Sequence, residues 1–519
     1  MNRDTSSNST PTQPNDGSTD GSTLSVWAAE VSMPKTKPLL IDVETDVCIV
    51  GAGLGGITTA YLLQKEGKKV CVLEALDIGG GQTGRTTAQF STALDDRYID
   101  LEKYHGKQGA KIAAESHQEA LNVVEKIIRE EKIECGFKRL PGYLFRSPDT
   151  EADILEQELE AAHRAGLSSL HLTEVKGPKA FMKGKALCFP DQIQLQPLKY
   201  LKALAELILQ RGGQIYTGTK VVSASGGKNA EVKTQNGFSV SCKSIVVATN
   251  SPMNDIFSIH TKQAPYRSYV VALKVPKGSV EEAFYWDTTD PYHYVRLEGD
   301  DLLVVGGEDH KTGQNETPEE CFEKLEAWTR SQFPAAQDVV YRWSGQVMEP
   351  YDGMAYLGHN PLDKNNVYII TGDSGNGMTH CTIGGVLITD QIMGRDNPWE
   401  KLYHPSRVSP RATAEYLKEN ANVAVQYADW GKPHHSFADI QSLPADEGII
   451  VRDGMKLLAV SKTASGEIEK LSAVCTHLGG IVHWNSVEKT WDCPCHGSRF
   501  DRTGKVVEGP AFIDLPSAD

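Results

Sequence analysis

The pattern of apolar positions near the start of the chain predicts a strand, a glycine-rich turn, a helix and a second strand. Four apolar residues, Val47–Val50, lead directly into glycines and then into a stretch with helical spacing that ends at Gly67. A second apolar run follows at Val70–Leu73. This order predicts a parallel α/β sheet in the first part of the chain.

Further along the chain the pattern alternates between helical and strand-like stretches. Short alternating segments between about 264 and 307 predict an antiparallel sheet. A proline-rich connector, DNPWEKLYHPSRVSP, precedes a predicted helix, and from about 434 the chain is β-rich with frequent turn residues. Helical spacing is expected in residues 107–133, 151–166, 197–211, 382–393 and 412–430.

Length and charge narrow the class of protein. A chain of 519 residues fits two or three domains, and its formal net charge of −15 disfavours nucleic acid as a partner. No uninterrupted apolar run is long enough for a membrane span. The first residues are almost all Ser, Thr, Asn, Asp, Gly and Pro, so we expect a disordered tail over 1–35. With no secretory signal and ten scattered cysteines, a cytoplasmic protein is expected.

The first glycine turn carries a dinucleotide-binding pattern. Gly51, Gly53 and Gly56 form G-x-G-x-x-G between a strand and a helix, where glycines let the backbone approach a pyrophosphate. Glu74 ends the second strand, where it can accept hydrogen bonds from ribose hydroxyls. A lone motif of this kind also occurs as a structural turn, but its strand–helix–strand context favours the dinucleotide site.

A second glycine-rich turn favours FAD over NAD. Residues 79–88, GGGQTGRTTA, offer hydroxyls at Thr83, Thr86 and Thr87 and a cation at Arg85 for diphosphate and ribitol. With the later segments SIVVATN and VYIITGDSGNGMT, residues 42–395 resemble the D-amino-acid oxidase and glycine oxidase family of flavoproteins. The resemblance implies an α/β Rossmann-like FAD-binding domain interleaved with an antiparallel-sheet substrate domain. The implied FAD-binding residues are Gly51, Gly53, Leu54, Gly55, Gly56, Glu74, Ala75, Gly81, Thr83, Arg85, Thr86, Thr87, Val221, Thr249, Gly372, Gly375, Asn376, Gly377 and Met378.

Two departures from that family matter for chemistry. Sarcosine-oxidase-like members attach FAD to a cysteine, but the corresponding stretch WSGQVMEPYDG has none, so non-covalent FAD is expected. Those members also carry a lysine for a substrate carboxylate after the last glycine turn, whereas this chain has Thr379 and His380. The resemblance therefore does not extend to an α-amino acid substrate.

Four residues near the C-terminal end have the spacing of an iron-sulfur site. Cys475 and His477 form C-x-H, and after 15 intervening residues Cys493 and His496 form C-x-x-H. Two Cys and two His in two loops suit a Rieske [2Fe-2S] centre, although the same set also suits zinc. The flanking sequences CTHLGG and CPCHGSRFDRTGKVVEGPA resemble Rieske proteins over about residues 434–519, which implies an all-β domain and favours the cluster.

The Rieske-like loops also depart from the respiratory proteins that they resemble. Gly480 stands where those proteins carry a second loop cysteine, so Cys495 is expected to be a free thiol. Ser498 keeps a hydroxyl that can hydrogen-bond to the cluster, whereas Phe500 replaces a tyrosine. We therefore expect a redox potential below that of the respiratory proteins and above that of plain ferredoxin types.

The resemblances divide the chain into several units. The expected order is the tail at 1–35, an oxidoreductase at 36–395, a linker with a helix at 396–433 and the Rieske domain at 434–519. Within the oxidoreductase, the expected FAD-binding parts are about 36–94, 191–254 and 346–395, and the substrate-domain parts are about 95–190 and 255–345.

A flavin accepts two electrons, whereas the cluster takes one at a time. The whole chain resembles bacterial FAD-dependent oxidoreductases with a C-terminal Rieske domain, and we expect a dehydrogenase. A small amine or related C–H substrate would be oxidised, and electrons would pass through the cluster to an acceptor protein or quinone. The alternatives are a reductive or oxygenating enzyme whose electrons enter through the Rieske centre, and a redox sensor. Candidate catalytic residues, taken from the predicted sheet and the last glycine turn, are Arg267, Tyr269, His293, His310 and His380.

Overall fold

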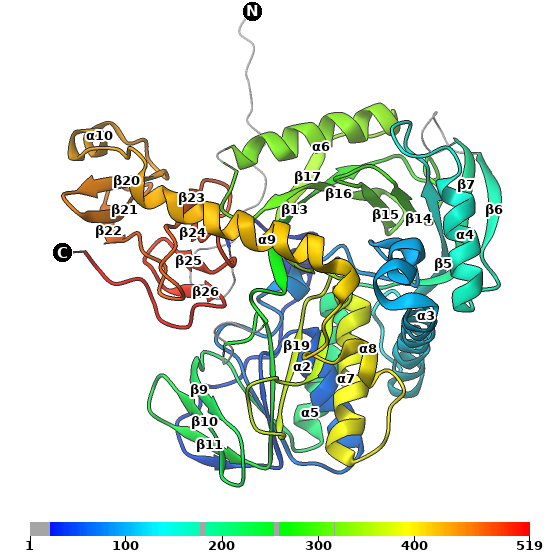
Figure 1. The fold of residues 1–519 in the computed structure, drawn as a ribbon, viewed down its shortest axis with the longest axis horizontal. Coiled ribbons are helices and arrows are strands. Elements are labelled where there is room, and N and C mark those ends of the chain that lie inside the picture. Colours follow the sequence, from blue (N-terminus) through cyan, green and yellow to red (C-terminus); the bar gives the residue numbers. More distant parts are fainter. Residues whose placement is uncertain (1–20, 177–182, 254–258, 316, 519) are drawn as a thin grey trace, which may run out of the picture.

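The computed structural model describes residues 21–176, 183–253, 259–315 and 317–518. Figure 1 shows a parallel sheet flanked by helices, a large antiparallel sheet beneath one long helix, and a β-rich unit that carries the C-terminus. Among the described residues, none of the helices combines the length and apolar character needed to cross a membrane.

A six-stranded sheet forms the base of the molecule. Its order is β18-β19-β12-β2-β3-β8, and all neighbours are parallel except β18 and β19. The strands are β2 (Val47–Val50), β3 (Val70–Leu73), β8 (Gln214–Tyr216), β12 (Ser244–Asn250), β18 (Tyr356–His359) and β19 (Val367–Thr371). The predicted bounds of the first two strands are confirmed.

Each face of this sheet packs into a different apolar cluster, which explains why its strands have continuous apolar runs. Ile49 and Val72 pack with helix residues, whereas Val50 and Leu73 pack with a small four-stranded sheet. The helices are α2 (Leu54–Lys65), α5 (Pro197–Gln210) and α7 (Gly377–Met393). The small sheet consists of β1 (Val43–Glu44), β9 (Val221–Ser225), β10 (Ala230–Thr234) and β11 (Ser239–Cys242).

A nine-stranded, mostly antiparallel sheet stands above the first and confirms the predicted substrate-domain sheet. Its order is β17-β13-β16-β15-β14-β5-β7-β4, with β6 beside β7. The strands are β4 (Gln89–Phe90), β5 (Lys138–Phe145), β6 (His171–Lys176), β7 (Lys183–Gln194), β13 (Gln263–Lys274), β14 (Phe284–Asp287), β15 (Tyr294–Glu298), β16 (Leu302–Lys311) and β17 (Val339–Pro350).

Helix α6 (Pro318–Gln332) packs on one face of that sheet, as Figure 1 shows. Its Phe322 and Leu325 join Tyr269 and Val271 of β13 in one apolar cluster. Two other helices, α3 (Arg97–Glu131) and α4 (Ile154–Ala165), flank the sheet.

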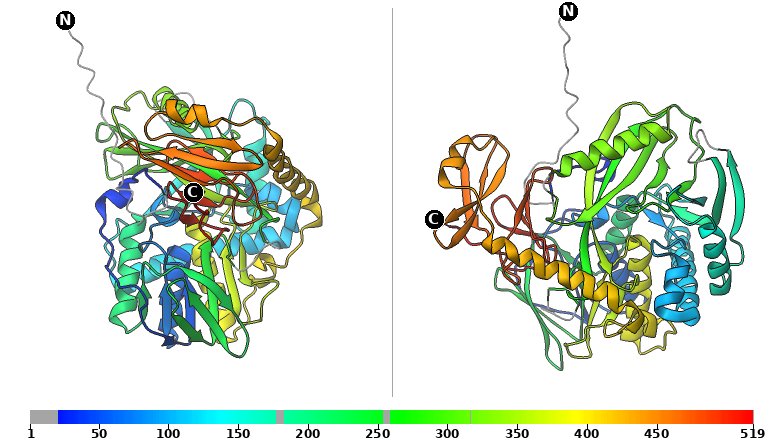
Figure 2. Two further views of the ribbon diagram at one scale, coloured as in Figure 1. Left: turned by 90° about the vertical axis from the view of Figure 1, so that its left-hand side faces the viewer. Right: turned by 45° about the horizontal axis from the view of Figure 1, so that its top comes forward.

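The C-terminal unit is reached through a linker that contains a long exposed helix. Figures 1 and 2 show this helix, α9 (Thr413–Gln426), running to the C-terminal unit from the part of the chain that contains the six- and nine-stranded sheets, here called the flavin-type fold. In the chain, α8 (Glu400–Tyr403) and η2 (Pro410–Ala412) precede it, and η3 (Tyr427–Gly431) and α10 (Phe437–Ser442) follow it.

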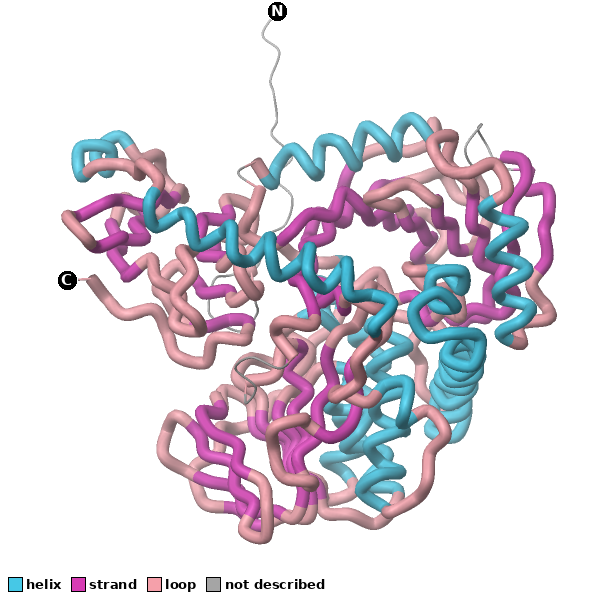
Figure 3. Tube along the Cα trace, in the orientation of Figure 1, coloured by secondary structure: helices cyan, strands magenta, loops and turns pink. Residues whose placement is uncertain are grey.

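The unit beyond the linker is built from two small antiparallel sheets, and Figure 3 shows that strands and loops dominate it. One sheet consists of β20 (Gly448–Asp453), β21 (Lys456–Lys462) and β22 (Ile468–Ser472). The other consists of β23 (His483–Asn485), β24 (Thr490–Asp492), β25 (Arg499–Asp501) and β26 (Val506–Glu508).

The expected disordered tail needs a correction for residues 21–35; residues 1–20 lie outside the described part. Residues 26–30 form helix α1 (Val26–Glu30), and Trp27 is fully buried. The indole of Trp27 donates a hydrogen bond to the carbonyl oxygen of Thr86 at 2.6 Å. One large aromatic side chain therefore anchors a segment whose neighbours are mostly polar.

Candidate functional site

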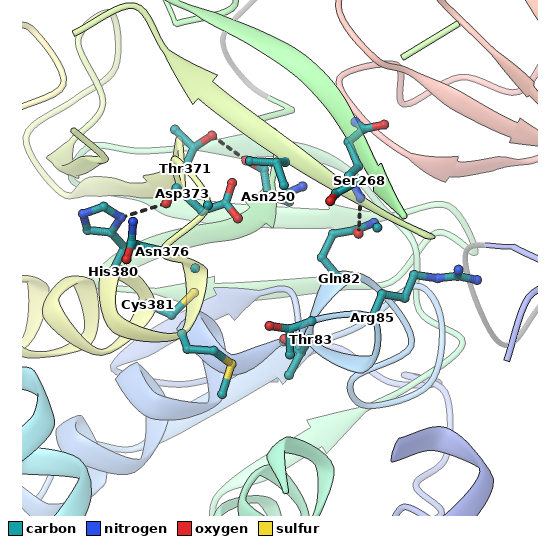
Figure 4. Close-up of a pocket in the computed structure, with 18 of the residues that line it drawn as sticks. Gln82, Thr83, Arg85, Asn250, Ser268, Thr371, Asp373, Asn376, His380 and Cys381 are labelled. Carbon is teal, nitrogen blue, oxygen red and sulfur yellow. Dashed lines mark hydrogen bonds between the residues drawn. The ribbon is translucent and has the colours of Figure 1, made fainter. Parts of the chain in front are cut away.

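The two sheets enclose a cavity of about 710 Å³. Figure 4 shows Gln82, Thr83 and Arg85 on one side of this cavity and Asp373 and His380 on the other. Residues of the C-terminal unit complete the lining, namely Val506, Val507, Glu508, Gly509, Ala511 and Phe512. The cavity is therefore shared between the flavin-type fold and the C-terminal unit.

The first glycine turn is built for close backbone approach. Gly51 has a φ of +105°, and a Cβ there would lie 2.5 Å from the carbonyl oxygen of Ala248. A Cβ on Gly56 would lie 2.0 Å from the carbonyl oxygen of Gly51. Only glycine allows helix α2 to start this close to the strand, which exposes the helix N-terminus to the cavity.

Most predicted FAD-binding residues line the cavity, whereas Gly56 and Gly372 do not. Gly56 packs the helix against the turn, and Gly372 lies against Pro350 and Tyr356. The residues that do line it are Gly51, Gly53, Leu54, Gly55, Glu74, Ala75, Gly81, Thr83, Arg85, Thr86, Thr87, Val221, Thr249, Gly375, Asn376, Gly377 and Met378.

Glu74 and Thr83 organise the backbone around the turn. The carboxylate of Glu74 accepts hydrogen bonds from the amides of Ala52 at 2.7 Å and Leu76 at 2.8 Å. Burial raises the pKa of Glu74, and those amides oppose the shift. Thr83 Oγ1 accepts from the amide of Leu54 at 2.9 Å. The cavity, exposed helix terminus and glycine cradle fit a dinucleotide such as FAD.

Arg85 has a partner that the sequence did not reveal. Its guanidinium lies 3.0 Å from Glu488 of the C-terminal unit, and both side chains are buried. Arg85 also donates to the carbonyl oxygen of Ser344 at 2.8 Å. Arg85 therefore forms an interface ion pair at the edge of the cavity, and its expected role as the cation for the FAD diphosphate stays a prediction.

The chain segment at 21–25 is tied to the same carboxylate. The amide of Thr23 donates to Glu488 at 3.1 Å, and its hydroxyl donates to the other oxygen at 2.5 Å. Arg85, Arg267 and Arg499 lower the pKa of Glu488 to about 2, against the opposing effect of burial. A buried carboxylate thus joins three parts of the chain.

Replacing Glu488 with glutamine is expected to lower the free energy of unfolding by roughly 3–5 kcal/mol near neutral pH, because it breaks a buried ion pair. Since the pKa of Glu488 is below its ordinary value, the stabilisation is present above about pH 4.5 and disappears as the pH falls toward 2. Denaturant titrations of both proteins across pH 2–7 check this, with the exposed Glu467→Gln as control. A constant difference across that range would contradict it.

Four of the five predicted catalytic residues lie away from the cavity. Arg267, Tyr269, His293 and His310 do not line the cavity, whereas His380 does. Their chain neighbours line it instead, namely Tyr266, Ser268, Tyr292, Tyr294 and Asp309. Side chains of a strand point alternately to its two faces, and helix α6 covers the face of β13 that carries Tyr269. The residues on either side of Tyr269 therefore point to the opposite face, toward the cavity.

The four predicted catalytic residues outside the cavity lining contact other side chains of the protein. The hydroxyl of Tyr269 and Nε2 of His310 are 2.9 Å apart. Nδ1 of His293 lies 2.8 Å from Asp287, and its ring stacks on Trp328 at 4.0 Å. Arg267 is buried and donates to Ser344 at 3.2 Å.

One part of the cavity wall is acidic and aromatic. Asp95 accepts a hydrogen bond from Tyr292, and Asp309 accepts one from Ser268. Asp95 is exposed to the cavity; desolvation within the cavity, with neighbouring carboxylates adding to it, raises the pKa of Asp95 to about 8 and that of Asp309 to about 7. Sequence reasoning missed these residues because an aspartate in a loop or strand end carries no signal of which way it points.

His380 faces the same region as a neutral imidazole. Its Nδ1 lies 2.9 Å from the carbonyl oxygen of Asp373. Burial lowers the pKa of His380 to about 4. It is therefore uncharged near neutral pH and does not offset the nearby carboxylates.

The four predicted cluster ligands come together at the tips of two loops. The thiols of Cys475 and Cys493 are hydrogen-bonded to each other, and the rings of His477 and His496 are 5.0 Å apart. Nδ1 of His496 is buried and has no hydrogen-bond partner among the described residues. An imidazole nitrogen in that state suits an iron ligand, so these residues fit a [2Fe-2S] cluster.

No three His, Cys, Asp or Glu side chains within the described residues are placed around one metal ion. A Rieske cluster takes two thiolates on one iron and two imidazoles on the other, so its ligands are not expected to gather around one point.

The loops also confirm the expected free thiol. Cys495 forms no disulfide, and a Cβ on Gly480 would lie 2.5 Å from its sulfur. The missing partner cysteine would therefore have stood at Gly480. Ser498 Oγ is hydrogen-bonded to Cys475, the neighbour expected for a residue that tunes the cluster.

The imidazole side of this site faces the flavin-type fold. The ring of His260, which is buried, lies 5.0 Å from that of His477 and 6.4 Å from that of His496. His260 belongs to the connection between β12 and β13, outside the C-terminal unit.

Known proteins share both parts of this arrangement. Residues 46–391 match the family described as FAD dependent oxidoreductase, and residues 436–518 match the Rieske [2Fe-2S] domain. YhfW of Bacillus subtilis (strain 168), named as a Rieske 2Fe-2S iron-sulfur protein, is 31% identical over 499 residues, which are 95% of this chain and 97% of YhfW.

Two further comparisons cover the flavin-type part alone. The gamma-glutamylputrescine oxidoreductase of Escherichia coli (strain K12) is 27% identical over 67% of this chain and 84% of its own. The crystal structure of L-proline dehydrogenase from P. horikoshii has a TM-score of 0.61 at 19% identity and covers 71% of this chain and 98% of its own, which shows a shared fold.

The predicted fold class is confirmed: an FAD-binding fold interleaved with an antiparallel sheet, followed by an all-β Rieske domain. Proteins of this family bind FAD, and Rieske domains bind a [2Fe-2S] cluster, so both predicted cofactors are confirmed. The chain belongs to the FAD dependent oxidoreductase family and is an oxidoreductase with a C-terminal Rieske domain.

Proposed function

We propose that this enzyme is an amine dehydrogenase whose electrons leave singly through the Rieske cluster. The observation that carries the proposal is the shared cavity, in which residues 506–509, 511 and 512 of the Rieske domain contribute to the wall of the FAD site. The cluster ligands His477 and His496 lie beside His260 of the flavin domain rather than at an exposed tip.

The acidic side of the cavity favours a cationic substrate. Asp95, Asp309 and Asp373 all line it, and the neighbouring His380 is neutral. A bound ammonium group would place a positive charge beside these carboxyl groups. The rings of Tyr292 and Tyr294 would contact the carbon skeleton of the substrate. One relative, gamma-glutamylputrescine oxidoreductase, is itself named for an amine compound.

The bound ammonium gives one proton to a cavity carboxylate, and the adjacent C–H bond then breaks with its electron pair as hydride. The nitrogen lone pair closes the C=N bond, and water hydrolyses the resulting iminium ion. FAD supplies a two-electron acceptor that can release electrons one at a time. Two equivalents of an external one-electron acceptor, a protein or quinone, take the two electrons.

Asp95 is proposed as the proton acceptor because its pKa of about 8 is close to working pH. In the wild-type protein, kcat/KM for an amine should rise with pH toward about 8 as Asp95 ionises. Replacing Asp95 with asparagine should lower kcat/KM by roughly a hundredfold and remove that rise.

Steady-state assays across pH 6–9 with an artificial one-electron acceptor measure both effects. Asp100→Asn, on the first turn of α3 and outside the cavity lining, is the matched control. An Asp95→Asn protein that keeps the wild-type pH profile would exclude the proposed role.

A screen of amines under anaerobic conditions tests the function as a whole. We expect amines without a carboxylate to bleach the flavin without any added reductase. If no amine does so and only an external reductase reduces the protein, the alternative reading holds, in which electrons enter through the Rieske centre.

A further inference from the structure

Gln346 of β17 connects the cavity wall to the cluster loops. Its side chain is 2% exposed and contributes to the cavity lining. Its Nε2 donates a hydrogen bond of 3.0 Å to the carbonyl oxygen of Gly497, the residue directly after the ligand His496. Gln346 therefore contacts both the FAD site and a cluster-binding loop.

The direction of the Gln346 amide is set by its surroundings. Its Oε1 accepts a hydrogen bond from the hydroxyl of Thr312 at 3.3 Å, which leaves Nε2 for Gly497. The backbone amide of Gln346 donates to Oε1 of Gln82 at 2.6 Å, and Gln82 also lines the cavity. The side chain is held at both ends.

Gly497 allows the two domains to come this close. Its φ is +80°, and a Cβ there would lie 2.4 Å from Cβ of Pro265 and 2.8 Å from Nε2 of Gln346. Its own amide donates to the carbonyl oxygen of Cys493 at 3.1 Å. The flavin domain therefore packs directly on the turn that joins the ligands Cys493 and His496.

We propose that Gln346 is the positioning residue for electron transfer between the FAD site and the cluster, an inference that rests on the proposed function. The route runs from the cavity wall through the amide of Gln346 and the carbonyl of Gly497 to the ring of His496. The rate of electron tunnelling falls steeply with distance, and it is higher through covalent and hydrogen bonds than across a gap. The hydrogen bond from Gln346 to Gly497 therefore shortens the effective path. With both cofactors bound, a reduced flavin would give up one electron at a time, a proton leaving to solvent, and the cluster would accept that electron at one iron and pass it to the external one-electron acceptor before taking the second.

The test follows internal electron transfer without any substrate. In holoenzyme with both cofactors, a light flash with a deazaflavin donor reduces the flavin, and cluster reduction is followed by absorbance. Gln346→Met keeps the length of the side chain and removes its donor, so we expect transfer several-fold slower than in the wild type. FAD content, both midpoint potentials and the electron paramagnetic resonance (EPR) g values of the cluster should stay near wild type.

Gln314→Met removes the hydrogen bond of 3.2 Å that another glutamine donates to the carbonyl oxygen of Pro494 in the same cluster loop, and because Gln314 lies outside the cavity lining it is the matched control, expected to transfer at the wild-type rate. If Gln346→Met loses a cofactor, Gln346→Asn decides, because its amide is one methylene too short to reach Gly497. Wild-type transfer rates in a Gln346 variant with intact cofactors would overturn the inference. An absence of transfer in the wild-type protein would instead overturn the proposed function.

Discussion

Replacing Cys493 with serine is expected to abolish turnover with a one-electron acceptor while the flavin can still be reduced by substrate. Cys493 is buried beside Cys475 at the cluster loops, and loss of one thiolate removes a ligand that iron requires. Iron and sulfide analysis should show the cluster lost, and the Rieske EPR signal should disappear. The flavin absorbance should remain and should bleach when substrate is added under anaerobic conditions.

Cys495 provides the matched control for this change. It lies in the same loop, is equally buried, and is a free thiol that the cluster does not require. Cys495→Ser should keep the cluster and most of the turnover. Undiminished turnover in Cys493→Ser after loss of the cluster would show that electrons leave the flavin by another route.

Replacing Gly56 with alanine is expected to weaken FAD binding strongly. The added Cβ would lie 2.0 Å from the carbonyl oxygen of Gly51, and backbone cannot move aside as a flexible side chain can. Overpacking of this kind costs about 1–3 kcal/mol, which corresponds to roughly a tenfold to hundredfold loss of FAD affinity if the strain falls on the bound state. Fluorescence titration of the apoprotein with FAD measures the loss.

Gly55→Ala in the same helical turn is the control. Its Cβ would lie 3.3 Å from the sulfur of Cys381 and from a methyl carbon of Ile370, which are side-chain atoms that can shift. The Rieske spectrum of both variants reports whether the C-terminal domain stays folded. Equal FAD affinities for Gly55→Ala and Gly56→Ala would refute the role given to the close contact at Gly56.

Features carried by contiguous residues could be predicted from the sequence. The strand Val47–Val50, the glycines that follow it and the loops around Cys475 and Cys493 each owe their structure to a few neighbouring residues. Glycine spacing and paired Cys–x–His motifs therefore predict a dinucleotide turn and a cluster without knowledge of the rest of the fold.

In the antiparallel sheet, it could not be predicted which face of a strand points into the cavity. Strand β13 is buried along nearly its whole length, so its sequence shows no alternation between apolar and polar positions. Because a shift of one residue exchanges the two faces, the choice of Arg267 and Tyr269 missed Tyr266 and Ser268.

Contacts between the domains also could not be predicted from local sequence patterns. Arg85 and Glu488 are 403 positions apart, and no sequence motif around either residue indicates that the two form a pair. The same holds for Thr23 of the predicted tail, which binds the same carboxylate. Such pairs follow from how the domains pack, and that packing is what brings the cluster to the FAD cavity.

The most direct test of the account mixes the oxidised holoenzyme with an amine that bleaches it, without oxygen and without acceptor, and freezes samples at successive times for EPR. Flavin bleaching should be followed, within one turnover, by the signal of a reduced Rieske cluster. A cluster that stays oxidised while the flavin is fully reduced would contradict electron transfer between the two sites.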